Sequence, residues 1–253
     1  MTSLPFLISI AHGGEEIPEE IKMCIRLSRE EILEDGDAFT TYLFDVYPHC
    51  PIVKASIARA FIDLNRAPDA LPPIHSDGVI KNQTCFKKPI YKAGYEPDNQ
   101  LISLLIDKYY HPYYQELKKH ASRDIILGLD CHSMAEFAPP ISNLSGEKRP
   151  LINLGDVNGS ACDPEITKRL ADCFRKVFNL ISKDVSINKP FSGGRISQVF
   201  GKKPIPWIQI EINRSLYLKK PWFNSETWEI DYSRLRSIKS LFLKVLKQFV
   251  SYT

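Results

Sequence analysis

The chain has 253 residues, of which 43% are hydrophobic and 25% are charged, and its formal net charge at pH 7 is +3. This composition excludes an intrinsically disordered chain, and the length suffices for a large core without disulfide bonds. The small excess of positive charge argues against a nucleic-acid partner or a membrane-surface partner. No apolar stretch reaches the roughly 18 residues that a membrane-spanning helix requires. The first residues carry no basic segment typical of a signal peptide, so we expect a cytoplasmic protein.

Apolar runs that alternate with amphipathic segments predict strands that alternate with helices. The predicted strands cover residues 6–11, 57–64, 124–130, 151–155 and 207–212. Apolar residues recur at steps of three and four in three other segments, which predicts helices around residues 101–113, 166–178 and 235–249. This alternation predicts a single α/β domain over residues 1–253, with a mixed, mostly parallel sheet covered by helices on both faces.

The segment 69–99 breaks this pattern, because it is rich in Pro, Gly, Lys and Asn and has little periodicity. A long irregular excursion of this kind is typical of a lid or substrate loop, and a plain surface loop is the alternative. The six cysteines form no CxxC pattern. We expect them to be unreactive buried thiols rather than a metal site or a nucleophile.

Two histidines lie at the ends of predicted strands. His12 begins the tetrapeptide HGGE at residues 12–15, where a histidine and Glu15 can bind one cation on a tight turn, although such tetrapeptides also arise by chance. His132 follows the third predicted strand, and Asp130 is placed to orient its imidazole ring. A short spacing followed by a long one is typical of a catalytic zinc site, in which three protein ligands leave one position open.

Anion-binding side chains are concentrated in residues 59–66, which include Arg59, Asn65 and Arg66. A guanidinium group offers a planar fork to a carboxylate, and the Asn65 amide adds a donor. The alternative is structural, because Asp63 can neutralise Arg59 inside the protein. Further along, Glu211 lies between two isoleucines of a predicted strand. Burial should raise its pKa toward the working pH, which suits a general base.

In their order along the chain, these motifs resemble the N-formylglutamate amidohydrolase family. The blocks that carry the resemblance lie at residues 10–14, 63–66, 129–133, 155–156, 188–194 and 209–217. A wider resemblance connects the chain with aspartoacylases and zinc carboxypeptidases. Both resemblances imply a three-layer α/β/α sandwich of the phosphorylase/hydrolase-like or zinc-carboxypeptidase-like kind.

The resemblance also implies a role for each candidate residue. It implies one zinc ion bound by His12, Glu15 and His132, with Asp37 or Glu16 as the alternative carboxylate ligand. It implies Glu211 as the general base and Arg59 as the group that stabilises the oxyanion. Asn65 and Arg66 would bind the carboxylate of the substrate. The glycine-pair loop with Gly193, Gly194 and Arg195 would approach the substrate closely, and a simple surface turn is the alternative for this loop.

The implied activity is that of a zinc-dependent amidohydrolase that cleaves the amide of a small N-acyl amino acid such as N-formylglutamate. Three alternatives stay open. The same scaffold suits a carboxypeptidase-type peptidase or an N-acyl amino acid deacylase. A non-catalytic protein in which Arg59, Arg66 and Arg195 bind an anion without metal is the third. A set of histidine and carboxylate ligands also accepts iron, cobalt or manganese in place of zinc.

Overall fold

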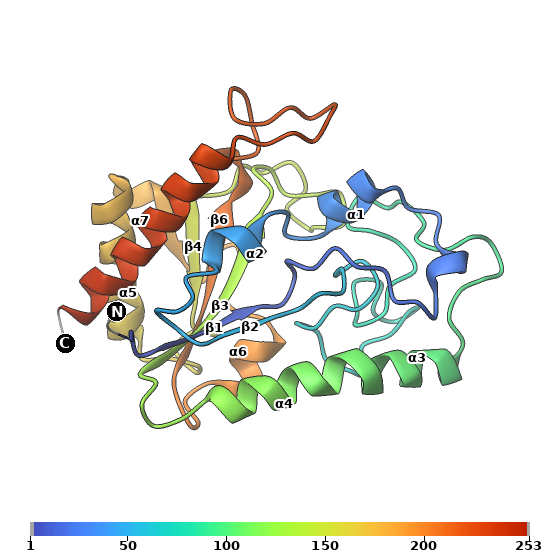
Figure 1. Ribbon diagram of the computed structural model, residues 1–253, viewed down its shortest axis with the longest axis horizontal. Helices are drawn as coiled ribbons and strands as arrows, with labels where there is room; N and C mark the ends of the chain where they lie inside the picture. Colours follow the sequence, from blue (N-terminus) through green and yellow to red (C-terminus); the bar gives the residue numbers. More distant parts are fainter. Residues whose placement is uncertain (1–2, 252–253) are drawn as a thin grey trace.

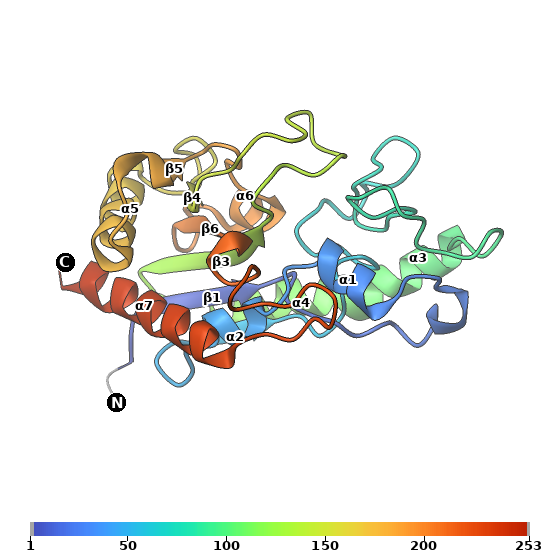
Figure 2. The same ribbon diagram turned by 90° about the horizontal axis from the view of Figure 1, so that it is seen from above.

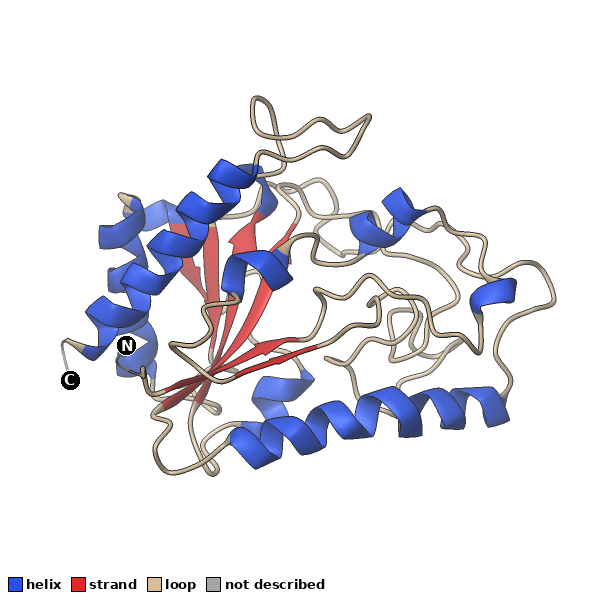
Figure 3. Ribbon diagram, in the orientation of Figure 1, coloured by secondary structure: helices blue, strands red, loops and turns tan. Residues whose placement is uncertain are grey.

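A six-stranded sheet forms the centre of the protein, as the computed structural model of residues 3–251 shows (Figures 1 and 3). The strand order is β2-β1-β3-β6-β4-β5. The strands are β1 (Phe6–Ile10), β2 (Ile52–Lys54), β3 (Leu127–Met134), β4 (Ile152–Gly155), β5 (Val185–Ile187) and β6 (Trp207–Asn213). Strands β2, β1, β3 and β6 run parallel to one another. Strand β4 pairs antiparallel with β6 and parallel with β5. The prediction of a mixed, mostly parallel sheet is confirmed.

Helices cover both faces of this sheet (Figure 1). One face packs against α2 (Thr40–Phe44), α5 (Pro164–Phe178) and α7 (Tyr232–Val250). The other packs against α4 (His111–His120) and α6 (Arg195–Phe200). The remaining helical segments are η1 (Lys22–Cys24), α1 (Arg29–Asp35), α3 (Asn99–Leu105), the π-helical η2 (Ile106–Tyr110), η3 (Ser182–Asp184) and η4 (Arg214–Leu216). The three predicted helices are confirmed as α5, α7 and the continuous α3–η2–α4 rod.

The alternation of side chains along the central strands separates an apolar core from a polar edge. Leu127, Leu129 and Cys131 of β3 belong to the core under α2, α5 and α7. Because neighbouring residues of a strand point to opposite faces, Asp130 and His132 project to the face of α4 and α6. The same alternation in β6 buries its isoleucines in the core and turns its polar residues to that second face. Polar side chains of both strands therefore meet on one side of the sheet.

The predicted strand at residues 57–64 is wrong. After a single bridge between Ile57 and Glu16, the chain turns, with the amide of Phe61 donating to the carbonyl of Ala58 at 3.0 Å. The run is apolar because it is buried on all sides in the core beneath α4, not because it joins the sheet. A short apolar run does not distinguish the two cases. The short strands β2 and β5 were not predicted.

The excursion at residues 69–99 lacks helices and strands up to α3, as predicted, but it packs tightly onto the rest of the protein. Its Lys81 is fully buried, and Nζ donates to Oδ2 of Asp35 at 2.6 Å. The amide of Cys85 donates to the other oxygen of Asp35, also at 2.6 Å. The excursion is therefore anchored to the end of α1. Within residues 3–251, no helix is long and apolar enough to cross a membrane.

Candidate metal centre and active site

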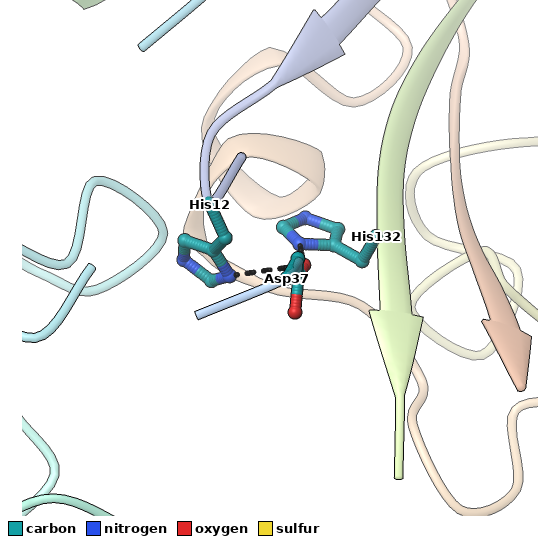
Figure 4. A group of neighbouring side chains, drawn as sticks. All are labelled: His12, Asp37 and His132. Carbon is teal, nitrogen blue, oxygen red and sulfur yellow. Dashed lines mark hydrogen bonds and ion pairs between the residues drawn. The ribbon is translucent and has the colours of Figure 1, made fainter. Parts of the chain in front are cut away.

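Two imidazole rings and one carboxylate converge at the carboxyl ends of β1 and β3. Figure 4 shows the side chains of His12, Asp37 and His132 pointing toward one another. Oδ2 of Asp37 lies 2.9 Å from Nδ1 of His132 and 3.6 Å from Nδ1 of His12. The centroids of the two rings are 4.5 Å apart, and all three residues are buried. The two histidines that the sequence singled out, 120 positions apart, are therefore neighbours in the fold.

Each member of this group is held by a different element. His12 lies two residues after the end of β1. Asp37 follows α1, and its backbone amide donates to the carbonyl of His12 at 3.0 Å. His132 lies inside β3 rather than after it, because β3 continues to pair with β6 as far as Met134. Backbone pairing thus fixes the positions of all three side chains.

Carboxylates orient both imidazole rings from behind. Nε2 of His12 lies 2.7 Å from Oδ1 of Asp63, and Nε2 of His132 lies 3.0 Å from Oδ2 of Asp130. Donation of the Nε2–H of His12 to Asp63 keeps the lone pair of its Nδ1 for a metal ion, whereas Nε2 of His132 also lies 3.0 Å from Nδ2 of Asn65. Burial alone would raise the pKa of Asp37, but the two histidines hold it well below the ordinary value. The donor set of two nitrogens and one carboxylate therefore fits a divalent ion.

Asp130 is itself held by a buried hydrogen-bond network. Oγ of Ser9 donates to Oδ1 of Asp130 at 2.9 Å, and the hydroxyl of Tyr113 lies 2.9 Å from the same Oγ. Nδ2 of Asn65 donates to Oδ2 of Asp130 at 2.8 Å. The network links α4, β1 and β3, so the orientation of His132 depends on packing between these elements.

Glu15, the predicted carboxylate ligand, lies outside this group. Its exposed side chain pairs with Arg29 at 3.0 Å, whereas Asp37 occupies the place beside the histidines. The chain after His12 continues alongside residues 56–58, where the amide of Glu16 donates to the carbonyl of Ser56 at 2.9 Å. The glycines before Glu15 serve this close approach, because a Cβ on Gly14 would lie 2.4 Å from the Ser56 carbonyl oxygen. Glu16 is exposed as well.

Glu211 lies next to His132 across the β3–β6 pairing. The side chain is buried at the polar edge of the sheet, and only 7% of the residue is exposed. Removal from water raises its pKa to about 7. Nε2 of Gln209 donates to Oε1 of Glu211 at 2.8 Å. A carboxyl group with this pKa can both accept and release a proton near neutral pH.

The predicted anion-binding arginines are bound by carboxylates of the protein itself. Nε of Arg59 donates to Asp63 at 2.8 Å, which is the structural pair that the sequence offered as the alternative. Asp77 bridges both arginines, because it accepts from Nη2 of Arg59 at 3.2 Å and from Nη2 of Arg66 at 2.6 Å. The side chain of Arg59 is 13% exposed and that of Arg66 is 35% exposed. Asp77 comes from the 69–99 excursion and was not singled out in the sequence.

Asn65 and the glycine-pair loop contact each other. Nδ2 of Asn65 faces Asp130, and its amide oxygen accepts from the backbone of Ile196 at 2.8 Å, so both ends of the amide are engaged. A Cβ on Gly194 would lie 2.3 Å from Nδ2 of Asn65, so only glycine fits there. Gly193 and Gly194 line the cavity described next, but Arg195 does not. Arg195 begins α6 and lies near Tyr110.

A cavity of about 580 Å³ opens over these groups. One wall comes from the 69–99 excursion, and another comes from the loop between β3 and β4; Figure 2 shows both loops on the same side of the molecule. Two further arginines line the cavity, Arg149 and Arg214. Arg214 supports the metal ligand directly, because its Nη2 donates to Oδ1 of Asp37 at 3.2 Å. Sequence reasoning did not predict a role for either arginine.

The chain is similar over most of its length to known amidohydrolases. The family model described as N-formylglutamate amidohydrolase matches residues 4–218. An N-formylglutamate deformylase from Pseudomonas putida is 28% identical over 229 residues, which cover 86% of this chain and 83% of that protein. An N-formylglutamate deformylase from Pseudomonas aeruginosa is 23% identical and covers 85% of this chain and 82% of its own length.

Among solved structures, an N-formylglutamate amidohydrolase from Ralstonia eutropha JMP134 superposes with a TM-score of 0.80 at 20% identity. The match covers 100% of this chain and 96% of that one, so the two share a fold. The comparisons confirm the prediction of an enzyme of the resembled family. On the match of the family model to most of its length, the chain belongs to the N-formylglutamate amidohydrolase family.

Proposed function

We propose that the protein is a metal-dependent amidohydrolase that removes the formyl group from an N-formyl amino acid such as N-formylglutamate. The observation that carries the proposal is the convergence of His12, Asp37 and His132 on one point beside the buried carboxyl group of Glu211. The two Pseudomonas relatives, both N-formylglutamate deformylases, favour the same reaction.

His12, Asp37 and His132 would hold the ion, and their donor set is typical of catalytic zinc. A bound divalent ion supplies Lewis acidity, which polarises an amide carbonyl and lowers the pKa of water. Asp63, hydrogen-bonded to Nε2 of His12, keeps that ring in the tautomer that presents Nδ1, and Asp130 lies beside Nε2 of His132. Arg214, which donates to Asp37, keeps that carboxylate from rotating away.

Glu211 acts as the general base and then as the general acid. It accepts a proton from the water whose oxygen forms a bond to the formyl carbon. It then delivers this proton to the amide nitrogen as the carbon–nitrogen bond breaks, which releases formate and the free amino acid. A pKa of about 7 suits both transfers, because neither protonation state is strongly favoured near neutral pH.

Two arginines would provide the positive charge that the substrate requires. Arg66 is the more exposed of the pair, and we assign it to the carboxylate on the α-carbon of the amino acid. Asp77 fixes the direction of its guanidinium group through Nη2. Arg59 lines the cavity behind Asp63 and would stabilise the negative charge that develops on the amide oxygen.

The test combines metal analysis with a substrate panel. Protein purified without chelator should contain one equivalent of a divalent metal and should release formate from N-formylglutamate. It should act much more slowly on N-acetyl and peptidyl substrates. Chelation should remove the activity, and readdition of zinc should restore it. A protein without stoichiometric metal that releases no formate would refute the proposal and favour an anion-binding protein. A preference for the peptidyl or acetyl substrate would favour one of the other hydrolases.

A further inference from the structure

One of the arginine side chains that line the cavity forms no ion pair within 4 Å among the residues that the structure describes. Of the four arginines that line the cavity, Arg59 and Arg66 are bound by Asp77, and Arg214 is bound by Asp37 and by the backbone carbonyls of Glu34 and Gly36. Arg149 differs from these three. Its Nε is buried without a hydrogen-bond partner, and within residues 3–251 no carboxylate lies in ion-pair distance of its guanidinium group, which feels the charge of Glu211 only from farther away.

The position of Arg149 is nevertheless well defined. Its guanidinium group stacks over the ring of Phe191 at 4.8 Å from the ring centroid. Its backbone amide donates to the carbonyl of Glu136 at 2.9 Å, and its carbonyl accepts from Nδ2 of Asn213 at the end of β6 at 3.3 Å. The side chain is therefore held in place by a ring and by backbone anchors, while no carboxylate of the described residues binds it directly.

A partly buried guanidinium group without an ion-pair partner is unfavourable, and here burial lowers its pKa. Such a group is compensated when an anionic ligand binds. The planar fork of arginine matches a carboxylate, and stacking on Phe191 removes part of the flexibility that binding would otherwise have to restrict. The site of this unpaired charge is the same cavity that holds Glu211 and the metal group.

We propose that Arg149 binds the side-chain carboxylate of the substrate and is the residue that distinguishes N-formylglutamate from its uncharged analogue N-formylglutamine. The inference rests on the proposed function, in which Arg66 binds the other carboxylate, on the α-carbon. The two ends of a dicarboxylate would then be held by two separate arginines, one already oriented by Asp77 and the other unpaired until the substrate arrives.

The experiment compares three substrates: N-formylglutamate, N-formylglutamine, and the α-amide of N-formylglutamate. Each is assayed by formate release with the metal-loaded wild type and with Arg149→Gln, Arg149→Lys and Arg169→Gln. Arg169 is the matched control, because it also stacks over a phenylalanine ring, at 4.2 Å from the centroid of Phe249, and also has a buried unpartnered Nε. It belongs to α5, on the far face of the sheet.

Arg149→Gln should lower kcat/KM about 10- to 100-fold for N-formylglutamate and for its α-amide. The kcat/KM for N-formylglutamine should stay unchanged. Arg149→Lys, which keeps the charge but loses the fork, should recover part of the loss. Arg169→Gln should change none of the three values. The wild type should prefer N-formylglutamate over N-formylglutamine.

Three results would overturn the assignment. An equal loss of kcat/KM for all three substrates would mean that Arg149 acts through Glu211 or through folding rather than on the side-chain carboxylate. A loss confined to substrates with a free α-carboxylate would assign Arg149 to that carboxylate instead. Equal kcat/KM values of the wild type for N-formylglutamate and N-formylglutamine would remove the selectivity itself. Formate release from none of the three would instead refute the proposed function.

Discussion

Replacing Glu211 with glutamine is expected to stabilise the metal-free protein while it removes proton transfer. Burial raises the pKa of this carboxyl group from 4.5 to about 7 in the folded state. The folded protein therefore keeps the proton over a pH range in which the unfolded chain has lost it. By linkage, the free energy of unfolding falls as pH rises from about 4.5 through about 7.

The size of this effect follows from the shift in pKa. Above the folded-state pKa, the ionised carboxylate costs about 3 kcal/mol relative to a neutral side chain of the same shape. Between about pH 5.5 and about pH 8, the cost grows by about 2 kcal/mol. Glutamine carries no charge, and its amide oxygen can still accept the hydrogen bond from Gln209. The substitution should therefore remove the cost and leave the packing intact.

The assay is urea unfolding of chelator-treated wild type and Glu211→Gln at these two pH values. The free energy of unfolding of the variant should exceed that of the wild type at both pH values, and the difference should be about 2 kcal/mol larger at the higher pH. Glu15→Gln, at an exposed position paired with Arg29, should show no such difference. A gain of equal size at both pH values would mean that Glu211 is ionised throughout, and the physical basis for its role as a base would be lost. The metal-loaded variant should retain its metal and lose about 10²- to 10⁴-fold in kcat.

Three further substitutions test the metal centre and the anion site. Asp37→Asn should greatly reduce the metal content measured by elemental analysis, whereas Glu15→Gln should retain it; the opposite result would restore Glu15 as the ligand. Asp130→Asn should weaken zinc affinity about 10- to 100-fold in competition with a chelating dye, because the His132 ring loses its orienting carboxylate, and an unchanged affinity would contradict this. Arg66→Ala should raise KM for N-formylglutamate about 10-fold or more with a smaller effect on kcat, and an unchanged KM would exclude Arg66 as the carboxylate binder.

Periodic signals predicted the parts of the fold and the site that lie on regular elements. β1, β3 and β6 are continuous apolar runs, so the polar residues within or directly after them stood out. His12, His132 and Glu211 were found in this way, and Asp130 was recognised because it lies two residues before His132 on the same side of a strand. The structure brings these residues to one edge of the sheet, as alternation in parallel strands requires.

Residues on irregular segments left no comparable signal. Asp37 follows a short helix and meets His132 only through the tertiary fold, so the sequence offered it merely as an alternative to Glu15. Asp77 lies in the excursion, where no periodicity indicates the direction of a side chain. The buried run at residues 57–64 gave a false strand, because a loop that is enclosed by the protein is as apolar as a central strand.

The buried pairing of Lys81 with Asp35 connects the cavity wall with the ion-binding group. Asp35 and Asp37 are separated by a single glycine, so the anchor of the excursion and a metal ligand share one short stretch of backbone. A displacement of the excursion would therefore also move the backbone that carries Asp37, and with it the spacing of Asp37 from His12 and His132.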